Sequence, residues 1–574
     1  MATRGNKWLL RLPKYPPRYC TTRVIGAPAR TAGNTDEERN RNRTSDGDRD
    51  QPTKYATVCW HISLVILIST MILALVWTIY LSVEYYACSS EERFEKLRQD
   101  FVVRERRRRV GGKLKLNDFE EMANARLLAI KQVDEELHHI WSDYQPRPHF
   151  LSKYKMNETD LYSVLRAMPK GGLLHVHDAG MFRADRLIEL TQYSNLWACV
   201  GSDGSFEDFR FSQNYPLIEP QGDYKCNWML MSNFRQQDGN ITSNKLRECL
   251  TINSNSFMSA THLANHMRRA HRLIHGLITY RPIWPTYLIS MLEDFYADGV
   301  SYVELRSSLP IMYDLVGTNY TIADTANSIV STTNIFRSIH DDFIGIKLIY
   351  APLRDYNDSK MDTYISNARF LKENFPSFFI GFDLISLGDE CNMPPLGDSL
   401  QLLHISKEID FYFHAGESRC VNSTQDSSPD TNIIDALLLG SKRLGNSFKL
   451  PLHSEILRIM RLLKVAAEMC PLSNHYMQYV NDFSQHPAAY LIAAGYPIVI
   501  GSDYPYFWNA APLTDDFYVA FVGIANGQAN LRLLKQLAMN SFMYSALSER
   551  EKRKALSIWQ HNWDQWIAGL VSQV

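Results

Sequence analysis

The sequence has almost no net charge. Its 574 residues include 61 Lys and Arg against 62 Asp and Glu, which gives a formal net charge of −1. A chain without an excess of either sign has no general electrostatic attraction to nucleic acid or to acidic partners. No internal repeat or low-complexity tract stands out either. With 45% apolar and 12% aromatic residues, the chain can bury a large core, as one large domain with extensions or as several ordinary domains.

Large apolar residues are scarce in residues 1–55, which are rich in Arg, Pro, Asp, Asn and Thr. This composition is typical of a disordered tail. Residues 56–83 are the opposite, an uncharged run with a single histidine. At ~1.5 Å rise per residue, the run is long enough to cross a hydrocarbon core of ~30 Å. A cleaved signal peptide would be shorter and nearer the N-terminus, so we predict a transmembrane signal anchor; the alternative is a buried helix of a soluble domain.

Charges on either side of this run indicate its orientation. The preceding tail is rich in Arg, whereas Glu84, Glu91 and Glu92 follow the run closely. The positive-inside rule therefore places the tail in the cytoplasm and the rest of the chain in the lumen or outside, as in a single-pass type II membrane protein. Shedding would release that part as a secreted protein. Five N-x-S/T sequons agree with a luminal glycoprotein. They are Asn157, Asn240, Asn319, Asn357 and Asn422.

Only seven cysteines follow the apolar run, and an oxidising compartment would allow them to form disulfides. They are Cys88, Cys199, Cys226, Cys249, Cys391, Cys420 and Cys470. Cys199 with Cys226 is the favoured pair, because both lie in one loop-like insertion. An odd number leaves at least one cysteine free or intermolecular, and Cys88 could bridge two chains.

The rest of the chain divides into a helical arm, residues 84–160, and a larger domain, residues 161–574. In the larger domain, short apolar runs alternate with longer helical patterns. The predicted strands are 171–177, 301–305, 343–351, 378–386, 409–414, 441–445, 465–470 and 497–501. Eight strands separated by helix-length intervals predict an α/β fold of the (β/α)₈ TIM-barrel type. Residues 195–250, which follow the first strand, lack a clear period and are predicted to be an inserted subdomain.

Four polar side chains at the ends of these strands form a candidate metal site. His175 and His177 are two apart on a strand and therefore share a face. His414 and Asp503 end the fifth and eighth predicted strands. Three imidazoles and one carboxylate, with room for water, match catalytic zinc or a similar divalent ion. Glu417, three residues beyond His414, is placed to transfer protons. The alternative is a group of structural core histidines.

These motifs resemble the adenosine-deaminase-related growth factors, a secreted branch of the adenosine deaminases. The resemblance covers roughly residues 93–574. Its motifs include Met168-Pro-Lys-Gly-Gly-Leu-Leu-His-Val-His-Asp, Tyr302-Val-Glu-Leu-Arg, Gly381-Phe-Asp-Leu, His414-Ala-Gly-Glu, Glu468-Met-Cys-Pro-Leu-Ser-Asn and Leu534-Lys-Gln-Leu-Ala-Met-Asn-Ser. Such a set, in this order, is highly specific to the family.

The resemblance implies an activity and a ligand set. His175, His177, His414 and Asp503 would hold Zn²⁺, and water acidified there would attack C6 of adenosine. Glu417 would protonate the purine ring, and Asp178 would contact the sugar. The family also implies a homodimer formed through the helical arm. An insertion after the first strand is associated with receptor and glycan binding in this family, which is the role implied for residues 195–250.

Several pocket positions depart from the family pattern, among them three single residues. Asn446 stands where the family has the histidine that takes a proton from the zinc-bound water, and an amide cannot act as that base. Tyr504 replaces a second aspartate that grips the purine. Ser386 stands where a family glycine lies against the ring; the alternative is that a shifted loop brings Gly388 to this place. We therefore expect a membrane-anchored, zinc-binding pseudoenzyme with weak or absent deaminase activity and a binding or signalling role. The alternative is an active zinc-dependent adenosine deaminase that converts adenosine and water to inosine and ammonia.

Overall fold

The computed structural model describes residues 53–87, 90–138, 153, 155–217, 225–237, 239–252, 259–354, 358–387, 396, 400–417 and 431–572. The chain separates into two compact units, Met1–Arg104 and Glu105–Val574. Residues 1–52 lie outside the described residues, so the predicted disordered tail stays a prediction. The same holds for the sequons at Asn357 and Asn422, whereas Asn157 and Asn319 are exposed.

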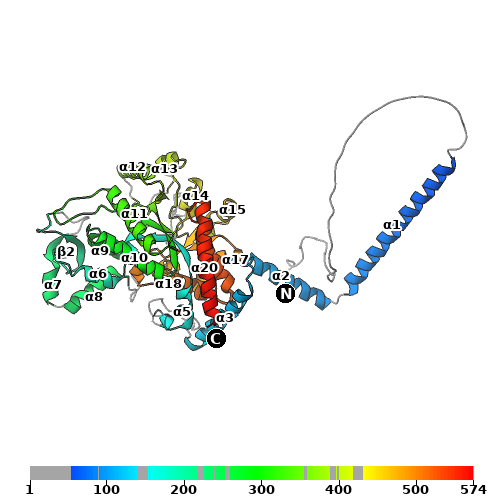
Figure 1. The fold of residues 1–574 in the computed structure, drawn as a ribbon, viewed down its shortest axis with the longest axis horizontal. Helices are drawn as coiled ribbons and strands as arrows, with labels where there is room; N and C mark the ends of the chain where they lie inside the picture. The colour runs from blue at the N-terminus through cyan, green and yellow to red at the C-terminus, as the bar shows by residue number, and fades with distance from the viewer. Residues whose placement is uncertain are drawn as a thin grey trace, which may run out of the picture. The chain divides into compact units, whose positions relative to one another are not determined.

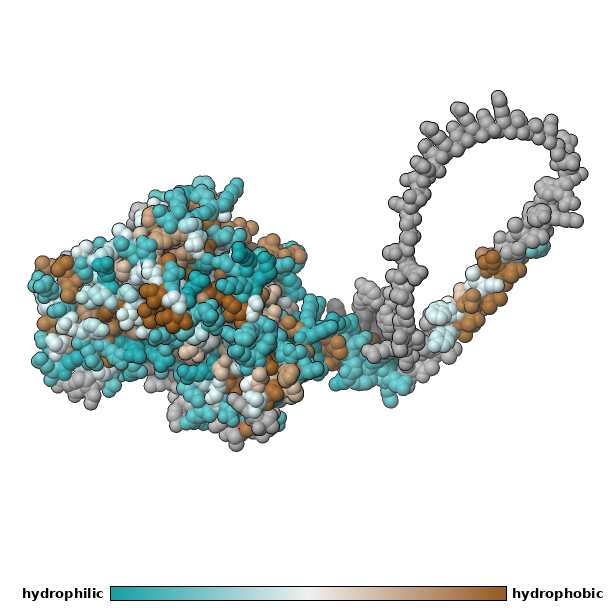
Figure 2. Space-filling view, viewed as in Figure 1, coloured by the Kyte–Doolittle hydropathy of each residue, from teal (hydrophilic) through white to brown (hydrophobic). Residues whose placement is uncertain are grey.

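The predicted apolar run lies within one continuous helix, α1 (Thr53–Ala87). Its described large apolar side chains are solvent-exposed; Leu73, for example, is 67% exposed. Figure 2 shows them as an apolar surface. Within the described part of the chain, no helix combines the length and the hydropathy needed to cross a bilayer. The signal anchor stays a prediction.

The larger unit contains two parallel sheets, drawn among their covering helices in Figure 1. The first has the strand order β1-β5-β6-β7, and the second has the order β10-β9-β8. Most of these strands lie where they were predicted. Their bounds are β1 Gly171–His177, β5 Val300–Ser307, β6 Gly345–Tyr350, β7 Phe379–Phe382, β8 Arg443–Leu444, β9 Ala466–Met469 and β10 Ile498–Ile500.

The predicted strand at 409–414 is the exception, because no strand forms there. Phe411 makes a single parallel bridge to Phe382 of β7, and His414 makes one to Gly445 beyond β8. Side chains take backbone donors that a ladder would use. The N–H of Phe413 donates to Ser441 Oγ at 3.1 Å, and that of His414 donates to an Asp383 carboxylate oxygen at 2.9 Å.

Two further observations connect the sheets. Val176 of β1 bridges Asp503, just beyond β10, in parallel, and the N–H of His177 donates to the Asp503 carbonyl at 2.9 Å. The ends of β1 and β10 therefore lie side by side, and the ends of β7, segment 409–414 and β8 do the same. These are the strand ends that carry the predicted metal ligands.

The insertion folds as a small antiparallel sheet with two helices. The strand order is β3-β2-β4, and the predicted disulfide between Cys199 of β2 and Cys226 of β4 is present, with the Cα atoms 5.4 Å apart. Its elements are β2 Leu196–Gly201, β3 Phe206–Phe211, β4 Cys226–Leu230, α7 Met231–Gln237 and α8 Gly239–Leu250.

In the unit Glu105–Val574, the helices share one apolar core with the parallel sheets. Within the described part of the predicted helical arm, α2 and α3 are separated by a turn at Gly111, whose φ is +77°. The bounds are α2 Ser90–Arg108, α3 Asp118–His138, α5 Asp160–Ala167, α6 Ala184–Leu190, α9 Ala260–Ile278, α10 Trp284–Ala297, α11 Ile322–Ile339, α12 Asp358–Asn374, α13 Leu400–Ile405, α14 Thr431–Leu438, α15 Ser454–Leu463, α16 Pro471–Tyr476, α17 Ala488–Ala494, α18 Thr514–Val519, α19 Leu531–Met543 and α20 Glu549–Ser572.

Candidate active site

The four predicted ligands converge at one buried point. Potential ligand atoms of His175, His177, His414 and Asp503 all lie within 4.8 Å of one another. The Nε2 atoms of His175 and His414 are 3.1 Å apart, and His177 Nε2 lies 3.2 Å from an Asp503 carboxylate oxygen. Separations near 3 Å are those expected between ligand atoms that share one ion at ~2.0–2.1 Å.

The chemistry of this group fits a divalent metal. Nδ1 of His175 lies 2.6 Å from the Glu468 carboxylate, and Nδ1 of His414 lies 2.7 Å from that of Asp383. Each carboxylate fixes the tautomer in which Nδ1 carries the proton and Nε2 presents a lone pair. Two lone pairs that face each other at 3.1 Å repel unless a cation lies between them.

A buried ionic network fixes these two carboxylates. Arg306 of β5 contacts Asp383 at 2.9 Å and Glu468 at 2.8 Å, and Arg443 of β8 contacts Glu468 at 2.5 Å. Burial alone would raise the pKa of Glu468, but the charges of Arg306 and Arg443 have the larger, opposite effect. The pKa of Glu468 therefore lies well below the usual range. Asp383 also has a lowered pKa, because His414 and Arg306 outweigh its burial. Both groups therefore stay ionised beside the imidazoles.

His177 differs from the other two histidines. Its Nδ1 is buried and has no hydrogen-bond partner among the described residues. Burial lowers the pKa of His177 to about 4 against the opposing effect of Asp503. The ring of Tyr504 stacks on its ring, with centroids 4.5 Å apart and planes 6° from parallel. An aromatic side chain thus supports His177 where carboxylates support the others.

Asn446 is fully buried, and its amide joins Glu417 to a directed chain of hydrogen bonds. Its Nδ2 donates to a Glu417 carboxylate oxygen. Its Oδ1 accepts from Asn474 Nδ2 at 2.8 Å, and Asn474 Oδ1 lies 2.9 Å from His486 Nε2. Because Nδ1 of His486 accepts from the N–H of Ala488, Nε2 carries the proton. Every donor in this chain of His486, Asn474 and Asn446 therefore points toward Glu417, and we call the chain the relay.

Tyr504 has a buried hydroxyl without a hydrogen-bond partner among the described residues. Burial, Asp503 and Asp178 raise its pKa well above the usual value, so the phenol stays protonated at neutral pH. Gly180 makes room for it, because a Cβ at this position would lie 2.5 Å from Tyr504 Cα. Tyr504 thus puts a neutral donor beside the candidate metal ligand His177.

Comparison with known proteins identifies matching family models and relatives. An adenosine/AMP deaminase N-terminal family model matches residues 73–165, and an adenosine deaminase family model matches residues 287–560. An adenosine deaminase of Lutzomyia longipalpis is 37% identical over 489 residues, which cover 83% of this chain and 94% of that protein. Adenosine deaminase 2 of Sus scrofa is 34% identical and covers 87% of this chain and 98% of that protein, and the Homo sapiens protein is 33% identical over 83% and 94%.

This chain belongs to the adenosine deaminase family. The matches to proteins named adenosine deaminase 2 support the growth-factor-related branch that the motifs resemble. Among solved structures, the apo N6-methyl-AMP deaminase of Arabidopsis thaliana has a TM-score of 0.48 at 15% identity and covers 70% of this chain and 99% of that one.

The other predicted substrate residues of this family member differ in their surroundings. Asp178 is buried beside the metal ligands; it lies 3.3 Å from His275 Nε2 and accepts from Ser307 Oγ at 2.5 Å. Burial raises the pKa of Asp178, but the hydrogen bond from His275 and its charge lower it to about 2. Ser386 is half-buried beyond β7. No hydrogen bond joins Ser386 to the ligand residues in the described structure.

The sequence prediction missed the residues that hold the ligands in place. Arg306, Asp383 and Glu468 lie in motifs quoted for the family, and Arg443 lies three residues before Asn446, but no role was predicted for these four residues. A signal was present, because charged residues inside short apolar strands must be paired to be buried. The relay residues Asn474 and His486 gave no such signal, since single polar residues near helices are common on protein surfaces.

Proposed function

We propose that this family member is a membrane-anchored extracellular protein that binds zinc, deaminates adenosine weakly or not at all, and has a binding or signalling role. The observation that carries this proposal is the amide of Asn446. The family places a histidine base there, whereas here the amide nitrogen donates to Glu417 and the amide oxygen accepts from Asn474. Both polar atoms are thus engaged within the protein, and neither can accept a proton as a base at neutral pH.

Zinc fits the convergent set of His175, His177, His414 and Asp503 better than magnesium or calcium does. Imidazole nitrogens with one carboxylate suit zinc, whereas magnesium and calcium prefer oxygen ligands. When bound there, zinc would supply a Lewis acid and lower the pKa of a bound water. Asp503 is further oriented by Ser473, whose Oγ donates to it at 2.5 Å.

Loss of the base has a large expected effect. General-base catalysis contributes typically ~10²–10⁴-fold to a rate. The Asn446 donor adds a second effect, because a hydrogen bond to a carboxylate favours its ionised form. The family role of Glu417 requires the protonated form, since the acid must donate to the purine ring. Both effects lower turnover while leaving the metal ligands intact.

Tyr504 changes how the pocket would recognise a purine. The family aspartate accepts or shares a proton at the ring, whereas the buried phenol of Tyr504 can only donate at neutral pH. A ligand acceptor such as a ring nitrogen would satisfy this hydroxyl. Weak nucleoside binding without turnover is therefore compatible with the pocket, and adenosine or a related purine nucleoside remains the ligand class we propose.

An active zinc-dependent adenosine deaminase is the alternative. The complete ligand set, the carboxylates behind His175 and His414, and the retained Glu417 favour it, since a scaffold without chemistry has no evident need for an acid at that position. This alternative requires another group to replace the base.

Several finer features belong to the same proposal. The parallel bridges at Val176, Phe382 and His414 support closure of the two sheets into a (β/α)₈ barrel, with segment 409–414 in the place of the fifth strand. The uncharged run at residues 56–83 of the sequence is the basis for proposing a type II signal anchor, with shedding as a route to secretion. We further propose that the arm mediates a homodimer, and that the disulfide-linked insertion, residues 195–250, binds a cell-surface receptor or a glycan.

Inosine formation by the purified full-length chain, loaded with zinc, tests the proposal. The wild type is compared with Asn446→His, Tyr504→Asp and the double variant. We expect the wild type to be silent or at least ~10²-fold slower than the double variant. Adding Glu417→Gln to the double variant should abolish the gained activity, which excludes a contaminating enzyme. Wild-type turnover at ordinary enzyme rates would instead establish the alternative.

A further inference from the structure

A second cluster of metal-ligand side chains lies next to the first. Potential ligand atoms of Asp178, His271 and His275 all lie within 4.8 Å of one another. Asp178 Oδ1 and His275 Nε2 are 3.3 Å apart, and the ring centroids of His271 and His275 are 4.1 Å apart. None of these three residues belongs to the set of four ligands described above.

Local structure brings the three together. His271 and His275 are four residues apart on α9, so their side chains leave the same face of the helix. Asp178 is the first residue of the short 3₁₀ helix η1 (Asp178–Gly180), directly after β1. Helix α9 packs on η1, and the two histidines therefore face the carboxylate at the end of β1. An imidazole pair at this spacing opposite a carboxylate is a common arrangement of zinc ligands.

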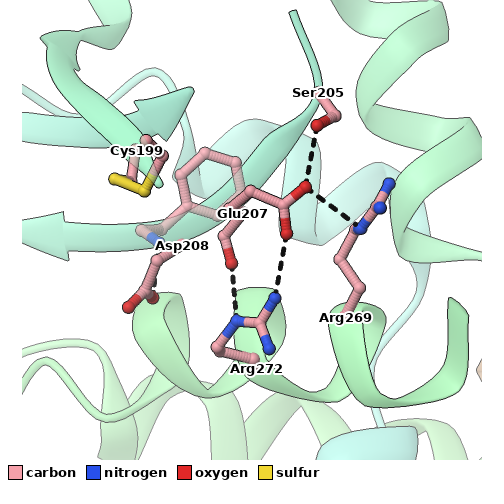
Figure 3. The surroundings of a disulfide bond; sticks show 8 residues. Cys199, Ser205, Glu207, Asp208, Arg269 and Arg272 are labelled. Atoms are coloured by element: carbon pink, nitrogen blue, oxygen red, sulfur yellow. Dashed lines mark hydrogen bonds and ion pairs between the residues drawn. A yellow bond between two sulfur atoms is a disulfide. The ribbon is translucent and has the colours of Figure 1, made fainter. Parts of the chain in front are cut away.

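Both sides of the cluster are fixed by neighbouring contacts. The free Asp178 oxygen accepts from Ser307 Oγ at 2.5 Å, and the Asp178 carbonyl accepts from Tyr287. Helix α9 itself is fixed to the insertion, since Arg272 contacts the Glu207 carboxylate at 3.0 Å and its carbonyl at 2.7 Å (Figure 3). Arg269 contacts Glu207 as well. Ligands on anchored elements lose little freedom when they bind an ion.

A hydrogen bond between His275 and Asp178 would alone explain those two residues, but it leaves His271 unexplained. His271 packs against His275, and no hydrogen bond of its ring nitrogens is recorded within the described residues. Its nearest titratable neighbours include His275, Asp178, His177 and Arg272. A cation shared with His275 and Asp178 would give the His271 imidazole a partner.

We propose that Asp178, His271 and His275 form a second divalent-cation site that takes an ion of the zinc class. Two imidazoles and one carboxylate suit a metal of borderline softness. The side chain of His275 is 19% exposed and that of Asp178 is 5% exposed, so the site is partly open and has room for water as a further ligand. The proposal does not depend on whether the chain deaminates adenosine.

The proposed site also predicts competition with nucleoside. The family resemblance assigns Asp178 to the substrate sugar, and a cation held by this carboxylate would occupy it. Occupancy of the second site would therefore weaken nucleoside binding at the first. Such an ion would be inhibitory, and its effect would disappear when the histidines of α9 are replaced.

The test is zinc stoichiometry of the full-length protein, measured by elemental analysis after stripping and reloading with Zn²⁺. We compare the wild type with His271→Gln, with the double variant His271→Gln, His275→Gln, and with His262→Gln as control. His262 lies on the same helix but is exposed and outside the cluster. Glutamine retains hydrogen bonding but is a poor zinc ligand.

We expect the double variant to bind one zinc fewer per chain than the wild type, and the His262→Gln control to bind the same number as the wild type. In the single His271→Gln variant, the affinity for the second zinc should fall at least ~10-fold. This variant keeps the His275–Asp178 hydrogen bond, so it tests the proposal even if the double variant does not fold. Equal stoichiometry and equal affinity in all four proteins would overturn the proposal. A loss of the remaining equivalent as well would point instead to disruption of the first site. If the first site binds no zinc, the wild type should still bind one zinc more than the double variant. The proposed function and the second site can therefore be tested separately.

Discussion

The two halves of the candidate site differ in how their polar groups are paired. In the metal-ligand half, His175 and His414 each have a carboxylate on Nδ1, and arginines neutralise those carboxylates. In the substrate half, which comprises Glu417, Asn446 and Tyr504, a buried phenol has no hydrogen-bond partner among the described residues, and an amide donates to Glu417. The comparison indicates that the ability to hold a metal and the ability to use it reside in different residues, so one can change without the other.

The largest effect expected comes from breaking the network behind the metal-ligand half. Arg306→Met leaves Asp383 and Glu468 short of a buried counter-charge, and loss of one partner of a buried ion pair costs about 3–5 kcal/mol. Urea denaturation of the full-length protein measures the loss. Arg369→Met is the control, since its pair with Glu408 lies at the surface, with both side chains 48% exposed. A similar loss in both variants would contradict the role assigned to the network.

Removal of one carboxylate behind a ligand should weaken the metal without removing a ligand. Asp383→Asn no longer supplies a charged partner for His414 Nδ1, and such changes cost about 10–100-fold in metal affinity. Zinc titration against a competing chelator measures the change. Asp410→Asn is the matched control, because Asp410 pairs with Lys442 at the surface. Unchanged affinity in Asp383→Asn would show that the carboxylate does not support the ligand.

The relay in the substrate half gives a pH dependence. Burial lowers the pKa of His486 to about 3 from 6.5. Between these values the unfolded chain binds more protons than the folded chain, so the free energy of unfolding falls as pH falls below about 6.5. From pH 7 to pH 5 the His486 contribution should fall by about 2 kcal/mol. His486→Gln should remove this part of the dependence, and equal pH profiles for wild type and variant would contradict it.

The smallest effect sharpens the contrast at Tyr504. Tyr504→Phe removes a buried hydroxyl that has no hydrogen-bond partner in the described part of the chain, so stability should stay the same or rise by up to about 1 kcal/mol. Tyr287→Phe removes a hydroxyl that donates to the Asp178 carbonyl and should cost about 1 kcal/mol or more. Thermal denaturation of both variants in chelator measures the difference. An equal loss would mean that the Tyr504 hydroxyl has a partner in solution.

Local pattern predicted the candidate metal ligands because each lies at or near the end of a predicted strand. Alternation within Gly171–His177 put His175 and His177 on one face, and parallel strands bring their ends together. The disulfide followed from two cysteines in one insertion. Segment 409–414 was predicted as a strand and forms only bridges, because Asp383 and Ser441 take its backbone donors. That competition depends on side chains far away in sequence.

Tertiary packing explains the other residues that the sequence did not predict. His275 is 97 residues away from Asp178 in the sequence, and His271 lies on the same helix as His275. Only the packing of α9 on η1 brings these three residues together. Asn474 and His486 join Asn446 in the same way. No local sequence pattern marks a polar residue whose role is to contact another polar side chain. The candidate metal ligands, in contrast, follow the apolar patterns of predicted strands.

The turnover number of adenosine deamination, measured on full-length protein whose zinc content is determined in the same preparation, tests the central claim most directly. We predict a preparation that holds zinc at the His175, His177, His414 and Asp503 site and forms inosine at least ~10²-fold more slowly than its Asn446→His, Tyr504→Asp variant. A zinc-loaded wild type that turns over as fast as that variant would contradict the separation of metal binding from chemistry.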